Sequence, residues 1–185
     1  FLDKDYSLDK LDKLTERKEN LWTYTPQIVS VLYNLGLDVK FYSKEELKPF
    51  LDGESFFRKH YGDDADKILK FTDIDAVIKS TKKLLKYDIF ERKILSLENI
   101  QEHIDENHVP MVLIDYNKIV GKEGNYQGHF VVITGYDGEH IYFHESGPIN
   151  PEPNKKVKKE IFEKAINANG TDNDCVVVYG KRVTT

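Results

Sequence analysis

The residues best suited to chemistry are His129 and Glu145, which belong to a strand–turn–strand pattern. Residues 128–136 form a mostly apolar run with His129 at its second position. The next two residues, Asp137-Gly138, are typical of a tight turn. Residues 141–145 form a second run that ends in Glu145. Because a hairpin brings the start of its first strand beside the end of its second, we expect the imidazole and the carboxylate to meet. Such a pair is the base-and-orienter half of a nucleophilic triad.

Other interpretations of this hairpin stay open. His144 is a competing base, although alternation along a strand should turn its side chain away from the face that carries Glu145. In a purely structural interpretation, His129 only begins one strand and Glu145 only ends the other. Gly128 favours the chemical interpretation, because a residue without a side chain beside His129 would let a substrate backbone approach closely.

A nucleophile is not evident in the sequence. The single cysteine, Cys175, opens an apolar strand, where a small buried residue is expected. One cysteine also excludes an intramolecular disulfide and a cysteine-based zinc site. His103 and His108 are five residues apart near the end of a predicted helix. This spacing is poor for binding a metal, so we interpret them as surface residues. We find no nucleophile elbow, phosphate loop or dinucleotide fingerprint, and expect neither a cofactor nor a metal.

Composition narrows the class of protein further. The 185 residues carry a net charge of −5, with basic residues dispersed, so a nucleic-acid partner is not expected. No apolar run approaches the roughly 18 residues of a membrane span, and a soluble, cytoplasmic protein is predicted, although a signal peptide could have been removed. The chain begins with Phe1 rather than methionine, so we expect a longer precursor. No feature indicates an oligomeric state.

The elements that must position the hairpin follow from the apolar periodicity. Helices are predicted over residues 8–14, 26–35, 97–104 and 157–168. Another is predicted to start at a capping box at 43–46, and three short helices are predicted within residues 53–87. Strands are predicted over residues 37–42, 110–115, 128–136, 141–145 and 174–179, and loops over 117–127 and 150–154. Helices come first and a mostly antiparallel sheet second. We therefore predict one α+β domain over residues 1–185, with a helical half at about 1–107 packed on a sheet half at about 108–185.

Five segments resemble known families. The block Gly-His-Phe-Val-Val-Ile-Thr-Gly-Tyr-Asp at 128–137, with His-Glu-Ser-Gly-Pro at 144–148, resembles the histidine block of papain-like cysteine peptidases of the bacteriocin-processing, double-glycine-leader type and of their peptidase-like relatives. Segments 21–27 and 35–39 fit the same wider group. Gly-Thr-Asp-Asn-Asp at 170–174 is similar to the C-terminal motif of guanylyl-cyclase-domain-containing proteins, whose sequences resemble the same fold.

The resemblance covers most of the chain and implies a papain-like fold. His129 matches the base of the family, and Glu145-Ser146 stands where the family has Asp-Pro. The family's nucleophilic cysteine lies at the start of an N-terminal helix, and its oxyanion-hole glutamine stands a few residues before that cysteine in the sequence. We expect both residues before Phe1. The implied activity is a thiol hydrolase, of peptidase or amidase type, acting on a peptide or protein substrate. An inactive papain-like module that binds peptide or protein is the alternative, and nucleotide binding is a third possibility.

Overall fold

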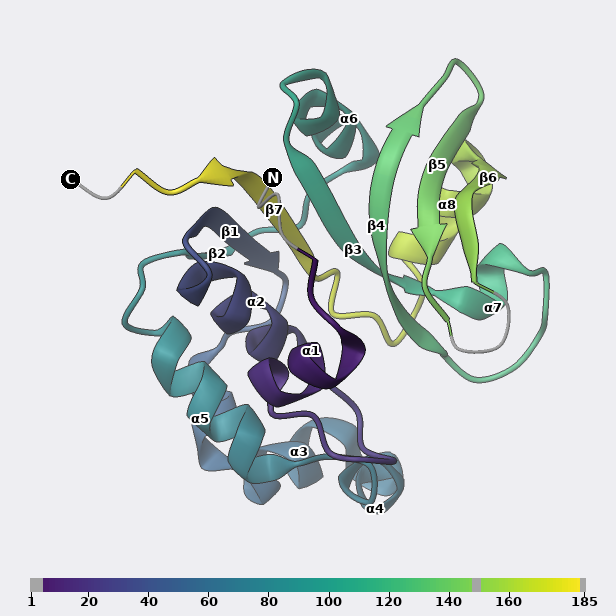
Figure 1. The fold of residues 1–185 in the computed structure, drawn as a ribbon. Coiled ribbons are helices and arrows are strands. Elements are labelled where there is room, and N and C mark those ends of the chain that lie inside the picture. The colour runs from purple at the N-terminus through teal and green to yellow at the C-terminus, as the bar shows by residue number, and fades with distance from the viewer. Residues whose placement is uncertain (1–4, 148–150, 184–185) are drawn as a thin grey trace. The chain divides into compact units, whose positions relative to one another are not determined.

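The computed structural model describes residues 5–147 and 151–183 (Figure 1). The chain divides into two compact units. The first contains residues 1–39, 46–90 and 180–185, and the second contains residues 40–45 and 91–179. Among the described residues, no helix combines the length and apolar character needed to cross a bilayer.

The first unit is helical. Its helices and 3₁₀ turns are α1 (Leu8–Thr15), α2 (Thr25–Asn34), η1 (Lys48–Asp52), α3 (Glu54–Tyr61), η2 (Gly62–Asp64), α4 (Ala65–Leu69) and α5 (Ile74–Leu84). Capping side chains define two of the starts: Ser7 accepts from the backbone N–H of Lys10, and Asp73 accepts from that of Ala76. Phe50, Phe57 and Val77 form a buried hydrophobic cluster in this unit.

The second unit carries most of the sheet, whose seven strands run in the order β2-β1-β7-β3-β4-β5-β6. The strands are β1 (Leu37–Ser43), β2 (Phe90–Arg92), β3 (Val109–Asp115), β4 (Gly128–Tyr136), β5 (His140–Glu145), β6 (Glu152–Lys158) and β7 (Cys175–Lys181). Pairing is antiparallel from β7 through β3, β4 and β5 to β6. The predicted α+β class with a mostly antiparallel sheet is therefore observed, and β7 is central, as its apolar sequence predicts.

Three helices accompany these strands: α6 (Leu97–Asp105), α7 (Tyr116–Ile119) and α8 (Lys159–Ile166). α6 packs against β3 and β4, and α8 packs against β3, β5 and β6. Phe162 on α8 meets Phe143 on β5 with ring centroids 5.8 Å apart, and both side chains are fully buried. This packing covers one face of the hairpin formed by β4 and β5, so the hairpin is a rigid support for the residues at its open end.

A β-bulge interrupts the β4–β5 hairpin. Ile133 pairs with Phe143, but the next pair along the hairpin joins Gly135 to Tyr142, which leaves Thr134 as an extra residue on β4. A one-residue shift in register exchanges the two faces of a strand. Val131 and Ile133, which precede the bulge, share the buried face with residues 141, 143 and 145 of β5.

Several local predictions were wrong. Ser43 ends β1 instead of starting a helix, and its hydroxyl accepts from the N–H of Glu45. Residues 152–158, predicted as a loop and the start of a helix, form β6. They become a strand because they pair with the edge of β5, although their own sequence has no strand pattern. The predicted loop over 117–127 begins with the short helix α7, and β2 was not predicted. Pro148 and Asn150 lie outside the described residues.

Candidate active site around His129 and Glu145

The open end of the β4–β5 hairpin brings His129 and Glu145 together. His129 is the second residue of β4 and lies opposite Ile114 of β3, while Glu145 is the last residue of β5. Nε2 of His129 lies 2.7 Å from Oε1 of Glu145. The predicted proximity of imidazole and carboxylate is therefore observed.

The register explains why the two side chains share a face. Val132 pairs with His144, so residues 129 and 131 of β4 and residues 143 and 145 of β5 lie on the same side of the sheet. His129 and Glu145 are then diagonal neighbours, a spacing that long side chains can bridge. His144, the competing base, is exposed on the other side and accepts a hydrogen bond from the N–H of Asn154.

Burial and tautomer follow from this contact. The Glu145 side chain is 2% exposed and that of His129 is 20% exposed, so the carboxylate is enclosed while the imidazole reaches solvent. A carboxylate at Nε2 fixes the N–H of a neutral imidazole on that nitrogen. Nδ1 is then left with a lone pair, which is the group that a general base needs.

Gly147 completes the support of the carboxylate. Its N–H donates to Oε1 of Glu145 at 2.7 Å, so one oxygen receives both this amide and the imidazole. A Cβ at position 147 would lie 2.8 Å from Oε1 of Glu145 and 3.2 Å from Cε1 of His129. The site therefore needs glycine here for space, and the sequence alone did not single out this role.

Tyr116 also contacts the imidazole. Its ring centroid lies 5.1 Å from that of His129, with the two rings inclined by 30°. Asp115, which is buried at the end of β3, fixes the start of this segment by accepting from the N–H groups of Asn117 and Gln127 at 3.1 Å each. The ring contact limits rotation of the imidazole, and nothing in the sequence pattern of residues 117–127 predicted it.

The space beside Gly128 is filled by the protein itself. A Cβ at Gly128 would lie 3.1 Å from Cε1 and from the hydroxyl oxygen of Tyr126, and a Cβ at Gly170 would lie 3.0 Å from Cβ of Tyr126. Burial raises the pKa of the Tyr126 phenol, which keeps it protonated. Gly128 thus makes room for Tyr126, whereas the sequence suggested room for a substrate.

One atom of the site remains without a partner. Among residues 5–147 and 151–183, the buried Oε2 of Glu145 meets no hydrogen-bond donor. A buried carboxylate oxygen without a donor is costly, because the lost hydration is not replaced. This atom marks a position at which an additional donor would stabilise the site.

Cys175 does not belong to this site. It pairs with Val112 on the side of β3 away from β4 and is 3% exposed. Burial raises the pKa of the thiol, so the thiolate that a nucleophile needs is suppressed. The structural interpretation of Cys175 fits these observations. His103 and His108, which the sequence indicated as surface residues, are partly buried and contact each other beyond the opposite end of β3.

The fold and the site thus define an α+β protein with a buried carboxylate that holds an imidazole at the end of a hairpin. A family model described as guanylylate cyclase matches residues 3–178. The chain belongs to this family.

Similarity is also found to a solved structure from Bacillus anthracis described as that of a C39-like peptidase. The two are 16% identical with a TM-score of 0.38, and the match covers 58% of this chain and 59% of that one. The papain-like form of the α+β fold, predicted from sequence, stays a prediction.

Proposed function

We propose that this chain provides the base and the orienting acid of a thiol hydrolase that acts on peptide or related amide bonds. The observation that carries the proposal is the 2.7 Å contact between Nε2 of His129 and the buried Oε1 of Glu145. A carboxylate that serves only to stabilise a fold is seldom buried against a single, partly exposed histidine, because burying it costs free energy.

The proposed mechanism uses both nitrogens of His129. Nδ1 removes the proton of a thiol while the sulfur attacks the substrate carbonyl carbon, and Glu145 stabilises the imidazolium that forms. The imidazolium then protonates the leaving amine as the carbon–nitrogen bond breaks. Water, activated by the same nitrogen, hydrolyses the resulting thioester and releases the acid.

The nucleophile in this proposal is a cysteine that precedes Phe1 in the full-length protein. Cys175, the single cysteine of the 185 residues, is buried and separated from His129 by β3. The proposal also retains the predicted single papain-like domain, a peptide or protein substrate and a cytoplasmic location.

The test uses the full-length protein and a thiol-alkylating probe. We expect one cysteine other than Cys175 to be alkylated rapidly near neutral pH, with the rate reduced about 100-fold or more in His129→Ala. The matched control is His144→Ala, which removes an exposed histidine of the same strand pair and should keep the rate of the unsubstituted protein. Equal rates in all three proteins, or a full-length protein whose only thiol is Cys175, would refute the proposal.

A second candidate is an inactive module that binds peptide or protein. It is favoured by the burial of the only thiol among these residues. In this case the His129–Glu145 pair stabilises a binding surface, and His129→Ala leaves binding unchanged in a folded protein. A peptide library is incubated with the unsubstituted protein and with His129→Ala. Equal binding without cleavage would favour this candidate over the hydrolase.

The family description names a guanylylate cyclase, which supports GTP as a third candidate ligand. We expect no GTP binding, since the sequence lacks a phosphate-binding loop. Formation of cyclic GMP that survives both thiol alkylation and His129→Ala would replace the hydrolase proposal.

A further inference from the structure

The C-terminus of α6 folds two histidines against each other. Asn107 has a φ of 62°, in the left-handed region, and the N–H of His108 donates to the carbonyl of His103 at 2.8 Å. The N–H of Asn107 also donates to the carbonyl of Ile104 at 2.9 Å. These bonds form a Schellman motif, which brings the first and last side chains of the turn together. Apolar residues usually occupy those two positions, and here both are histidine.

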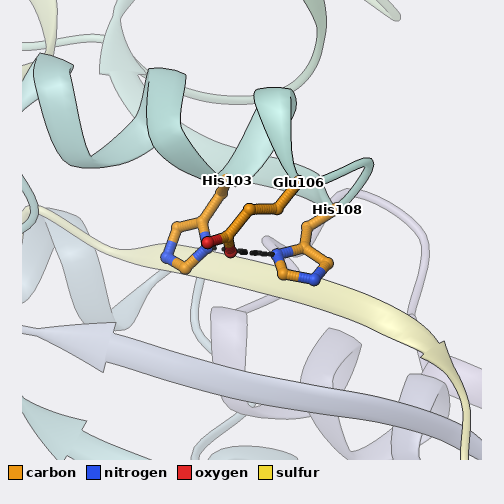
Figure 2. A group of neighbouring side chains, drawn as sticks. All are labelled: His103, Glu106 and His108. Atoms are coloured by element: carbon orange, nitrogen blue, oxygen red, sulfur yellow. Dashed lines mark hydrogen bonds and ion pairs between the residues drawn. The ribbon is translucent and has the colours of Figure 1, made fainter.

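Figure 2 shows that His103, Glu106 and His108 point toward one another. Nδ1 of His103 lies 3.3 Å from Nδ1 of His108, and Nδ1 of His108 lies 3.3 Å from Oε2 of Glu106. Zinc bonds of about 2.0–2.1 Å to nitrogen or oxygen in a tetrahedron require ligand atoms about 3.3–3.4 Å apart. Both separations therefore match the edge of a zinc coordination tetrahedron.

We propose that His103, Glu106 and His108 form a binding site for Zn²⁺ or a similar divalent transition metal. Two imidazole nitrogens and one carboxylate oxygen are ligands of Zn²⁺, Co²⁺, Ni²⁺ or Cu²⁺, whereas Ca²⁺ and Mg²⁺ prefer oxygen alone. Glu106 is 66% exposed, so the fourth position faces solvent and takes a water molecule.

The surrounding aromatic residues hold the two imidazoles in place. The ring of Tyr179 packs edge-on against both of them, with centroids 5.6 Å from His103 and 4.5 Å from His108. The Tyr179 hydroxyl is itself within 2.9 Å of the hydroxyl of Tyr42. Ligands whose rings are fixed by packing lose less conformational freedom when a metal binds.

The charge state of the pair suits a metal. Burial and the neighbouring His108 lower the pKa of His103, so its imidazole is neutral at neutral pH and its lone pair is available. Without a metal, the close nitrogen pair is satisfied only when one nitrogen carries a proton and donates it to the other.

This site is separate from the His129–Glu145 pair. His108 directly precedes β3, and His129 lies opposite Ile114, near the far end of the same strand. The five steps along the strand from Val109 to Ile114 span about 16 Å. Loss of the metal site and loss of the proposed hydrolase are therefore independent outcomes.

The experiment is a calorimetric titration of metal-free, full-length protein with Zn²⁺, together with Co²⁺ absorption spectroscopy. We expect the visible spectrum of tetrahedral Co²⁺, and affinity for Zn²⁺ reduced about tenfold or more in His108→Gln, because loss of even an outer partner costs that much. Glu106→Gln changes an exposed side chain, so the fold should persist and the affinity should still fall.

The matched control is His140→Gln. His140 also has a carboxylate partner, with its Nδ1 3.1 Å from Oδ1 of Asp137, but it is not part of a metal-ligating cluster within residues 5–147 and 151–183. Affinity should stay that of the unsubstituted protein in this variant, and Mg²⁺ should not compete. Equal Zn²⁺ affinity in Glu106→Gln, His108→Gln and the unsubstituted protein would overturn the proposal, as would an octahedral Co²⁺ spectrum.

Discussion

Gly147 donates its backbone N–H to the same Glu145 oxygen that lies 2.7 Å from Nε2 of His129. A side chain at position 147 competes for the space of that oxygen, since a Cβ would lie 2.8 Å from it. We predict that Gly147→Ala displaces the carboxylate and lowers the proposed hydrolase activity about 100-fold, the cost of misplacing a catalytic group by about 1 Å.

The control for this change is Gly138→Ala, because a Cβ at Gly138 meets nothing within 4 Å. The NMR chemical shifts of the His129 imidazole nitrogens provide a readout that does not depend on activity. Unchanged chemical shifts in Gly147→Ala would contradict the role of this glycine as a positioning residue.

Deletion of Thr134 removes the bulge from β4. The pairs of Ile133 with Phe143 and of Gly135 with Tyr142 then become consecutive in a regular ladder, so Val131 and Ile133, which are 0% and 3% exposed, keep their buried positions. We predict that the free energy of unfolding stays within about 1 kcal/mol of that of the unsubstituted protein, whereas a fall of about 3–6 kcal/mol, from about 1.5–3 kcal/mol for each apolar side chain, would contradict this register. Urea denaturation measures this, and Thr134→Ala, at an exposed position, should remain within about 0.5 kcal/mol of the unsubstituted protein.

Cys175 should resist thiol reagents while the protein is folded. Its side chain is buried in the sheet and its thiol pKa is raised, so both access and thiolate formation are suppressed. We expect reaction with a disulfide reagent only after denaturant is added. Rapid labelling of Cys175 in the native state, located by mass spectrometry, would show that this part of β7 opens readily.

The turn of the β4–β5 hairpin should weaken in acid. Hydrogen bonds from the hydroxyl of Tyr142 and from the N–H groups of Glu139 and His140 lower the pKa of Asp137 below its ordinary value. A lowered folded-state pKa gives stability that is complete above the unfolded value of about 3.9 and is lost as the pH falls through the folded value.

Asp137→Asn should therefore be less stable than the unsubstituted protein at pH 7. The difference should shrink as the pH falls below about 4, where the aspartate of the unfolded chain becomes protonated. Amide hydrogen exchange at Glu139 and His140 reports on this turn. A difference that stays constant from pH 7 to pH 2 would contradict the assignment.

The sequence predicted those parts of the fold in which one element alone carries the signal. The helices predicted over residues 8–14 and 26–35 are observed as α1 and α2, and the apolar run over residues 174–179 forms a central strand. β6 escaped prediction because its residues 152–158 are mostly exposed and become a strand only through pairing with β5.

The candidate site was predicted only where hairpin topology determines it. Pairing of His129 with Glu145 follows from hairpin topology, whereas the ring contact of Tyr116 depends on how a loop returns to the sheet. The contact of His103 with His108 was missed because helical spacing separates these residues, and the left-handed turn at Asn107 reverses that expectation. The available signal in the sequence was Asn107 itself, since asparagine often adopts a positive φ directly after a helix.

The extra residue in β4 also has an evolutionary consequence. In a relative without a residue at the place of Thr134, the pairs of Ile133 with Phe143 and of Gly135 with Tyr142 would be consecutive in a regular ladder, and the histidine and the acid would keep the same face. Such a relative would lose the bulge but not the pair. Gaps near this position should therefore occur among homologous sequences without any shift of the acidic residue.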